Sequence, residues 1–302
     1  MNEASLAIDV GATKVAIGLI ARSGEVLARV DVSSKVGSIE ELNSSLAAAI
    51  TNVMATPGVS VVGAGIGSAG PIDNVKGTIN PVNIPHWVDF SLVDFVREVS
   101  GLSSVRIIGD ASALAYAEFC VGAGRGATNL LGVVVSTGIG GGLILDGKVF
   151  PGETGNSCYI GHHSINFDGR QCACGRKGCV EAYSSGPQMV AIAHENGWDP
   201  NKKSFIDLAD AARQGNSIAL DAISQGTRAL SIGIVNFIGT LDINHVVIGG
   251  GVAQAGEIFW GPLQMHIQTE SKAIGFLKNV QLRKAELQRD AGVLGAALAV
   301  LG

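Results

Sequence analysis

Residues 6–20 read LAIDVGATKVAIGLI, two apolar runs joined by the turn Gly11–Lys14. Each run is short, apolar and bounded by turn residues, which is typical of buried strands. Gly11 permits a tight bend, and the backbone amides with the Thr13 hydroxyl can donate to phosphate oxygens. Asp9, at the end of the first strand, is placed to hold Mg²⁺, usually through water. Taken alone, the turn is weak evidence for a phosphate site, and an ordinary tight hairpin with a capping aspartate is the favoured interpretation.

Two further glycine turns follow strand-like runs later in the chain. Ser136–Gly142 reads STGIGGG and separates the apolar runs 130–136 and 143–150. Gly249–Gly251 follows the run 244–248 and precedes a predicted helix, whose first amides can face an anion. Three such turns indicate nucleotide binding far more strongly than one, and they fit two lobes closing on one nucleotide. The first is not a Walker A loop, which needs a longer glycine spacing and a following helix.

The composition excludes several classes of protein. The chain has 302 residues, of which 47% are hydrophobic, 16% are charged and 42 are glycine. Such a chain is too apolar to be disordered, and its glycines lack the three-residue period of collagen. The net charge of −5 and the absence of a Lys/Arg cluster argue against nucleic acid as a partner. We expect a cytoplasmic protein, because the first residues do not resemble a secretory signal.

The uncharged stretch 126–145 is long enough to span a membrane, but it contains six glycines. We therefore interpret it as strand, turn and strand. Further strands are predicted over 25–33, 59–66 and 105–108. Helices are predicted over 38–54, 91–99, 111–121, 187–196, 204–214, 218–240 and 291–301.

Alternating strands and helices indicate an α/β fold. The two halves also resemble each other, because DVGATKVAIGLI at 9–20 is matched by VVSTGIGGGLIL at 134–145. We interpret this likeness as a duplicated nucleotide-binding core.

A cysteine cluster predicts a structural zinc site. His162, Cys172, Cys174 and Cys179 follow the spacing His-x9-Cys-x-Cys-x4-Cys, a common set of one histidine and three thiolates. Buried reduced cysteines are the alternative, but the residues between these cysteines are polar. His163 is adjacent and could replace His162 as the ligand. The two other cysteines, interpreted as packing residues, are Cys120 and Cys158.

With these motifs together, the chain resembles the ROK family of sugar kinases over essentially its whole length. The zinc signature is the most specific of the motifs. The matching segments are Asp9–Lys14, Gly65–Pro71, Asn83–Trp87, Ser136–Gly142, Gly161–His162, Cys172–Gly186, Gly249–Gly251 and Asp290–Gly295.

The resemblance implies a role for each site residue. Asp110 is the implied general base that takes the proton from the 6-hydroxyl of the sugar, which then attacks the γ-phosphate of MgATP; without the family context it fits a helix N-cap before Ala111. His162 would ligate zinc with one ring nitrogen and contact the sugar with the other. The implied nucleotide-binding residues are Asp9, Gly11, Thr13, Lys14, Thr137, Gly138, Gly249, Gly250 and Gly251. The implied sugar-binding residues are Gly70, Asn83, Tyr159, His162 and Glu181.

The resemblance also implies an architecture. It is the duplicated ribonuclease H-like, actin-like ATPase fold, with two lobes and a cleft between them. We expect an N-terminal lobe of residues 1–115 plus 290–302, and a C-terminal lobe of residues 116–289 that contains a zinc loop at 161–181. A homodimer is implied by the family alone.

Two positions depart from the family pattern. Gly109 stands where the family usually has Asn, and Tyr159 stands where it usually has Glu. Both missing side chains normally hold sugar hydroxyls, and bacterial N-acetylmannosamine kinases of the family also lack that Glu. We therefore expect a kinase of N-acetylmannosamine or another substituted hexose, most of all an N-acetylmannosamine kinase, with glucokinase as the alternative. A non-catalytic sugar sensor or transcriptional regulator is the rival from another class, although the first strand begins near Leu6 and leaves no room for a preceding helix-turn-helix.

Overall fold

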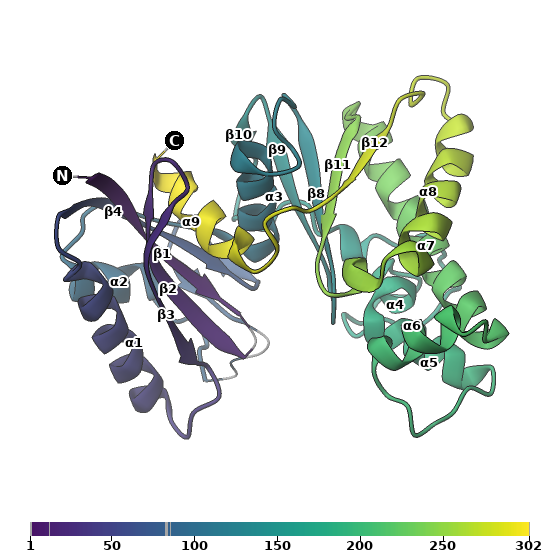
Figure 1. Ribbon diagram of the computed structural model, residues 1–302, viewed down its shortest axis with the longest axis horizontal. Coiled ribbons are helices and arrows are strands. Elements are labelled where there is room, and N and C mark those ends of the chain that lie inside the picture. Colours follow the sequence, from purple (N-terminus) through teal and green to yellow (C-terminus); the bar gives the residue numbers. More distant parts are fainter. Residues whose placement is uncertain (1, 12, 82–83, 85, 302) are drawn as a thin grey trace. The chain divides into compact units, whose positions relative to one another are not determined.

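The computed structural model describes residues 2–11, 13–81, 84 and 86–301. The chain forms two compact units (Figure 1). The first unit comprises Met1–Thr128, Gly142–Ser157 and Glu286–Gly302, and the second comprises Asn129–Gly141 and Cys158–Ala285. The first unit includes residues 116–128, because α3 (Asp110–Val121) packs against the C-terminal helix α9 (Ala291–Leu301), and residues 142–157, whose strand β10 contacts α3.

The first unit is built on a five-stranded sheet in the order β3-β2-β1-β4-β7. Its strands are β1 (Asn2–Val10), β2 (Lys14–Ala21), β3 (Val26–Ser33), β4 (Val59–Ser68) and β7 (Val105–Gly109). β1, β2 and β3 are antiparallel neighbours, whereas β4 runs parallel to β1 and β7 runs parallel to β4. Parallel pairing brings the carboxyl ends of β1, β4 and β7 to one edge of the sheet.

Helices cover both faces of this sheet, which explains the continuous apolar runs in its central strands β1, β2 and β4. Leu6 and Ile8 share a core cluster with α1 (Ile39–Met54), while Ala7 between them shares a cluster with α9. Ser38 caps α1 by accepting a hydrogen bond from the Glu41 amide at 3.2 Å. The predicted apolar stripe of α1 is fully buried. It consists of Leu42, Leu46, Ile50 and Val53.

Glycine allows α9 to approach its neighbours closely. A Cβ on Gly65 of β4 would lie 1.7 Å from the Ala296 carbonyl oxygen, and one on Gly295 would lie 1.8 Å from the Ala113 carbonyl oxygen. Both distances are far below van der Waals contact. A glycine at each position is therefore required for α9 to lie against β4 and α3.

The second large sheet repeats the pattern of the first. Its order is β10-β9-β8-β11-β12, again three consecutive strands followed by two that the chain reaches after helices. The strands are β8 (Leu130–Val135), β9 (Ile139–Leu145), β10 (Lys148–Val149), β11 (His245–Gly249) and β12 (Gln281–Lys284). This topology confirms the predicted duplicated α/β core.

The second glycine turn is shorter than the predicted range Ser136–Gly142. Gly140, Gly141 and Gly142 lie within β9, so the turn between the strands is Ser136–Gly138. A Cβ on Gly141 would lie 2.5 Å from the Cys158 carbonyl oxygen, and one on Gly142 would lie 2.4 Å from that of Ala111. These glycines serve close backbone packing and do not bend the chain.

Four of the remaining helices, α2, α5, α6 and α7, begin and end within one residue of the predicted ranges, and no range was predicted for α4 or α8. They are α2 (Leu92–Ser100), α4 (Glu181–Ser184), α5 (Gly186–Glu195), α6 (Phe205–Arg213), α7 (Ser217–Leu241) and α8 (Glu257–Lys272). Short 3₁₀ turns occur at Ile160–His162, Val252–Ala255 and Gln288–Asp290, and β5 (Ile72–Asp73) pairs with β6 (Thr78–Ile79). Within the described part of the chain, no helix has the length and apolarity to cross a membrane.

Candidate active site and metal centre

Two carboxylates expected in the site, Asp9 for Mg²⁺ and Asp110 as the base, lie at the ends of β1 and β7, which flank β4 in the sheet of the first unit. The pairing register sets Asp9 of β1 opposite Gly67 of β4, and Gly67 opposite Ile108 of β7. Asp110 follows two residues after Ile108, as the first residue of α3. The parallel topology thus brings together residues that are about one hundred positions apart in the sequence.

Asp9 is in an environment that opposes its negative charge. Burial raises the pKa of Asp9 to about 6; the nearby Asp110 carboxylate adds to the rise, and Arg29 and Lys14 oppose it. A Cβ on Gly292, in the first turn of α9, would lie 2.4 Å from Asp9 Oδ2. Asp9 is therefore held against the first turn of α9, whose backbone amides carry partial positive charge.

Asp110 is oriented by its own helix. Its Oδ1 accepts a hydrogen bond from the Ala111 amide at 2.7 Å, and Gly109 occupies the cap position before the helix. Asp110 is accessible to solvent, while protein atoms around it exclude enough water to raise the pKa of its carboxyl. A carboxylate with a raised pKa at a helix start is suited to accept a proton near neutral pH.

The first glycine turn is closed by a hydrogen bond from the Gly11 amide to the Lys14 carbonyl oxygen at 3.0 Å. Thr13 is exposed, so its hydroxyl is open to a ligand. The Lys14 ammonium forms an ion pair with Asp31, which also receives a hydrogen bond from Arg29 at 3.0 Å. In this structure Lys14 is thus engaged within the first unit.

Of the two sugar-side residues expected in the first unit, one can be described. Gly70 follows the end of β4 and is joined to Pro71 by a cis peptide bond. Asn83 lies outside the described residues.

The predicted zinc ligands come together in the second unit. One ligand atom from each of His162, Cys172, Cys174 and Cys179 lies within 4.8 Å of every other. The Cys174 and Cys179 sulfurs are 3.7 Å apart, and His162 Nδ1 lies 3.7 Å from the Cys172 sulfur. Two sulfurs bound tetrahedrally at about 2.3 Å would be separated by about 3.8 Å. The residues present therefore fit a zinc ion with four protein ligands.

The structure also decides between the two adjacent histidines. His162 belongs to the cluster through Nδ1, whereas His163 stacks on Phe237 with ring centroids 5.6 Å apart. Tyr159 is 43% exposed and stacks on the His162 imidazole at 5.6 Å. A metal that fixes His162 would thereby also orient the neighbouring tyrosine ring.

Glu181 links the cysteine cluster to the second glycine turn. It follows Cys179 by two residues and begins α4. Its Oε2 accepts a hydrogen bond from the Ile139 amide at 2.8 Å, and a Cβ on Gly138 would lie 2.8 Å from the same oxygen. A carboxylate has room for further donors, so this contact leaves Glu181 able to bind a sugar hydroxyl as well. Thr137, at the tip of the turn, is exposed.

The third glycine turn follows β11. Gly250 has φ +94°, and a Cβ there would lie 2.3 Å from the Val135 carbonyl oxygen. Only glycine satisfies both conditions. Gly251 is exposed and leads first into the 3₁₀ turn Val252–Ala255, so the predicted helix starts later, as α8 at Glu257.

Comparison with known proteins shows to which family the chain belongs. Residues 5–302 match the ROK family. The chain belongs to the ROK family.

Individual ROK proteins resemble it along almost their whole length. An N-acetylmannosamine kinase of Yersinia pestis is 33% identical, with 97% of each chain covered. A ROK hexokinase of Thermus thermophilus is 32% identical, with a TM-score of 0.89 over 99% of this chain and 98% of that one. A ROK glucokinase of Streptomyces griseus, solved with glucose and AMPPNP, is 28% identical, with a TM-score of 0.79 over 99% and 100% of the two chains. The family match and these relatives identify the chain as an ATP-dependent sugar kinase.

One residue that holds the cysteine loop in place was not among the sequence candidates. The Arg170 backbone amide donates to the Tyr183 hydroxyl at 3.0 Å, and its Nε donates to the Ala182 carbonyl oxygen at 3.1 Å. Its guanidinium forms a paired contact with Glu195 at 2.6 and 2.8 Å. Arg170 therefore joins the cysteine loop to α4 and α5. Its polar setting among the cysteines was the only local signal, because its partners lie 12 to 25 positions away.

Proposed function

We propose that this ROK kinase transfers the γ-phosphoryl group of ATP to the 6-hydroxyl of N-acetylmannosamine. The observation that carries the choice of sugar is the pair of departures at Gly109 and Tyr159. Gly109 offers no side chain beside Asp110, so one hydrogen-bonding group of the usual hexose site is missing. Tyr159 presents an exposed ring next to His162, which suits an apolar substituent such as an acetyl methyl group.

In this proposal Asp110 acts as the general base. It accepts the proton of the sugar 6-hydroxyl while the oxygen forms its bond to the γ-phosphorus and the bond to the departing ADP breaks. The raised pKa of Asp110 brings its proton affinity closer to neutral pH, where such a base is most effective. Phosphoryl transfer depends mainly on positioning and on stabilising negative charge.

The three glycine turns would bind ATP through backbone amides. The exposed Thr13 and Thr137 hydroxyls would add donors to the phosphate oxygens, and Gly249–Gly251 would approach the adenosine. Asp9 fits the oxygen ligands that Mg²⁺ prefers, and a bound Mg²⁺ would neutralise charge on the phosphates. Its raised pKa shows that a nearby positive charge would stabilise its ionised form.

His162, Tyr159 and Glu181 would contribute sugar contacts from the second unit. Because His162 Nδ1 faces Cys172, Nε2 is the nitrogen that we propose for the sugar. Zinc held by His162 and the three cysteines would fix the orientation of the imidazole. The hydrogen bond from the Ile139 amide to Glu181 would hold the second phosphate turn against the cysteine loop.

A kinetic screen tests the choice of sugar. We expect the highest kcat/KM with ATP for N-acetylmannosamine, ahead of N-acetylglucosamine, mannose and glucose. The similarity to a glucokinase solved with glucose makes glucose phosphorylation the alternative, and a clear preference for glucose would establish it.

An Asp110→Asn variant tests the catalytic assignment. Turnover should fall steeply while sugar and ATP binding persist, because the amide cannot take the proton. Asp94→Asn, which changes an exposed aspartate on α2, is the matched control. Full turnover in Asp110→Asn would remove that residue from its role, and a wild-type chain that binds sugars without phosphorylating any would instead indicate a sugar sensor. The homodimer implied by the family is tested separately by light scattering.

A further inference from the structure

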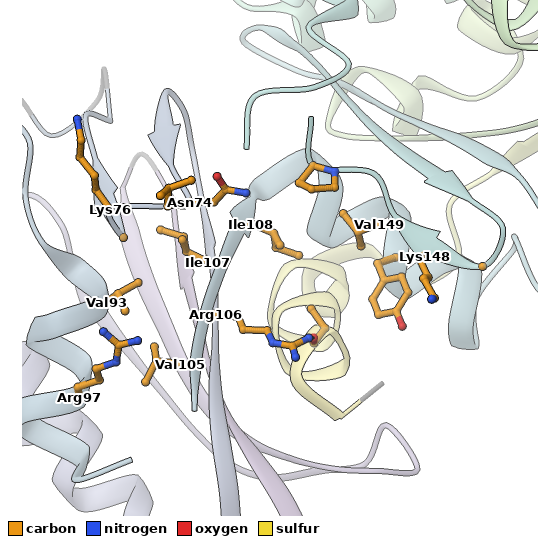
Figure 2. A pocket seen from close by; sticks show the side chains of 16 residues that line it. Asn74, Lys76, Val93, Arg97, Val105, Arg106, Ile107, Ile108, Lys148 and Val149 are labelled. Carbon is orange, nitrogen blue, oxygen red and sulfur yellow. The ribbon is translucent and has the colours of Figure 1, made fainter. Parts of the chain in front are cut away.

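The first unit contains a pocket that none of the catalytic or binding residues proposed above lines. Its volume is about 700 Å³, within the usual range of small-molecule sites. The edge strand β7 contributes Val105–Ile108 to its lining. The other lining residues come from α2, α3 and α9, from the turn that precedes β6, and from β10 with the residues on either side of it. Figure 2 shows Val93 and Arg97 on one side of β7, with Lys148 and Val149 on the other.

The lining is strongly basic. It contains four cationic side chains, and no aspartate or glutamate is among the lining residues. They are Lys76, Arg97, Arg106 and Lys148.

Two of these cations are already neutralised nearby. Lys76 pairs with Asp73 at 3.4 Å, and Arg97 pairs with Asp94 at 3.0 Å. Both pairs link residues three positions apart at an exposed surface, so they hold their partners only weakly.

Arg106 and Lys148 are the two cations that remain. Among the described residues, neither forms an ion pair with a carboxylate. Arg106 donates only to the Ala299 carbonyl oxygen, at 3.3 Å. The Tyr116 ring also lines the pocket, and the Arg106 charge acts on its hydroxyl. The pocket thus has about two uncompensated positive charges beside a phenol.

We propose that this pocket binds a small phosphate monoester. A phosphate monoester has a charge of about −1.5 to −2 near neutral pH, which matches the two unpaired cations. The planar Arg106 guanidinium suits phosphate oxygens, and Lys148 adds a point charge. The apolar side chains of Val105, Ile107 and Val149 would contact the carbon skeleton of the ligand.

A strand from another protein is a poorer fit for the same place. β7 has only five residues, and Arg106 is the second of them; short edge strands with a charged side chain resist pairing. A pocket of about 700 Å³ also suits a compact ligand better than an extended strand. The site accordingly suits sugar phosphates, among which the product of a sugar kinase is one member.

Calorimetric titration of the full chain tests the proposal. The probes are inorganic phosphate, glycerol 3-phosphate and glucose 6-phosphate, with glycerol and glucose as uncharged counterparts. We expect glycerol 3-phosphate to bind and glycerol not to bind at the same concentration. The double variant Arg106→Ala with Lys148→Ala should weaken binding at least tenfold, and raising the salt concentration should weaken binding to the wild type.

Controls separate this site from the active site and from damage to the fold. Lys148→Ala alone changes an exposed side chain and should weaken binding without altering the melting temperature or the basal sugar phosphorylation. Lys278→Ala, an exposed lysine of the second unit, should change nothing. Binding of glycerol 3-phosphate that is equal in all variants would overturn the proposal, as would binding of inorganic phosphate alone. Binding of a short acidic peptide in place of the monoesters would show a protein-docking edge instead.

Discussion

Replacing Gly109 by asparagine is the most informative single change in the proposed site. Gly109 is the residue before Asp110, with φ −64° and ψ 150°, values that any L-residue adopts. The nearest atom to a Cβ built there is Ser112 Oγ, at 3.8 Å. Asparagine therefore fits without backbone strain or steric conflict. Loss of glycine flexibility in the unfolded chain should stabilise the protein by about 0.4–1 kcal/mol.

The expected effect on specificity follows from one hydrogen bond. An asparagine amide beside the proposed general base Asp110 could bond a hexose hydroxyl, with a net gain of about 0.5–1.5 kcal/mol. Since about 1.4 kcal/mol corresponds to a factor of ten, the ratio of kcat/KM for glucose over N-acetylmannosamine should rise about two- to tenfold.

The assay is a competition between the two sugars at fixed ATP, read from the two kcat/KM values. Gly109→Ala is the matched control, because it adds a Cβ without an amide and should leave the ratio unchanged. An unchanged ratio in a stable Gly109→Asn variant would refute the reasoning that Gly109 governs the choice of sugar. So would an equal change in the alanine control.

Three further predictions concern stability and the metal. Glu118 is fully buried and accepts hydrogen bonds from the Ala123 and Leu287 amides at 2.8 Å each. Glu118→Ala should therefore lower the free energy of unfolding by about 2–5 kcal/mol, and Glu118→Gln should lower it by less. A denaturation curve of Glu118→Ala that matches the wild type would contradict this prediction. The pKa of Asp9 is raised to about 6 in the folded chain, so protonation of Asp9 at low pH stabilises the folded state by at most about 3 kcal/mol. This stabilisation should be lost as the pH rises from about 4 to 6. The melting temperature should therefore depend less on pH in Asp9→Asn than in the wild type, and parallel curves for the two proteins would contradict this prediction. Cys179→Ser should reduce bound zinc measured by atomic absorption and raise KM for both sugar and ATP, because the same loop carries Glu181; an effect on sugar alone would show that the Glu181 contact with the phosphate turn is dispensable.

Local sequence patterns predicted most elements of the fold. The apolar runs of β1, β2, β4 and β8 and the stripe of α1 are encoded within ten to twenty neighbouring residues, where periodicity is readable. β12 has the sequence QLRK, with two charged side chains in four residues, so no apolar pattern predicted this strand. It is a strand because β11 offers it a parallel partner.

The same division applies to the site. Residue types and short spacings alone predicted the zinc ligands and the glycine turns, because each of these motifs lies within one short stretch of the chain. Tertiary structure decided between the two histidines: the His162 ring joins the three cysteines, whereas the His163 ring stacks on Phe237. It also joined Glu181 to Ile139 across 42 positions.

The sequence by itself thus determined the duplicated α/β core, the histidine and cysteine cluster and the glycine turns, all of which depend on short-range pattern. Only the folded chain decided which strand ends meet, which glycines of 140–142 serve packing, and that four cations gather in one pocket. Those contacts join residues far apart in the sequence, and they arise from strand register and helix packing, which no local pattern records.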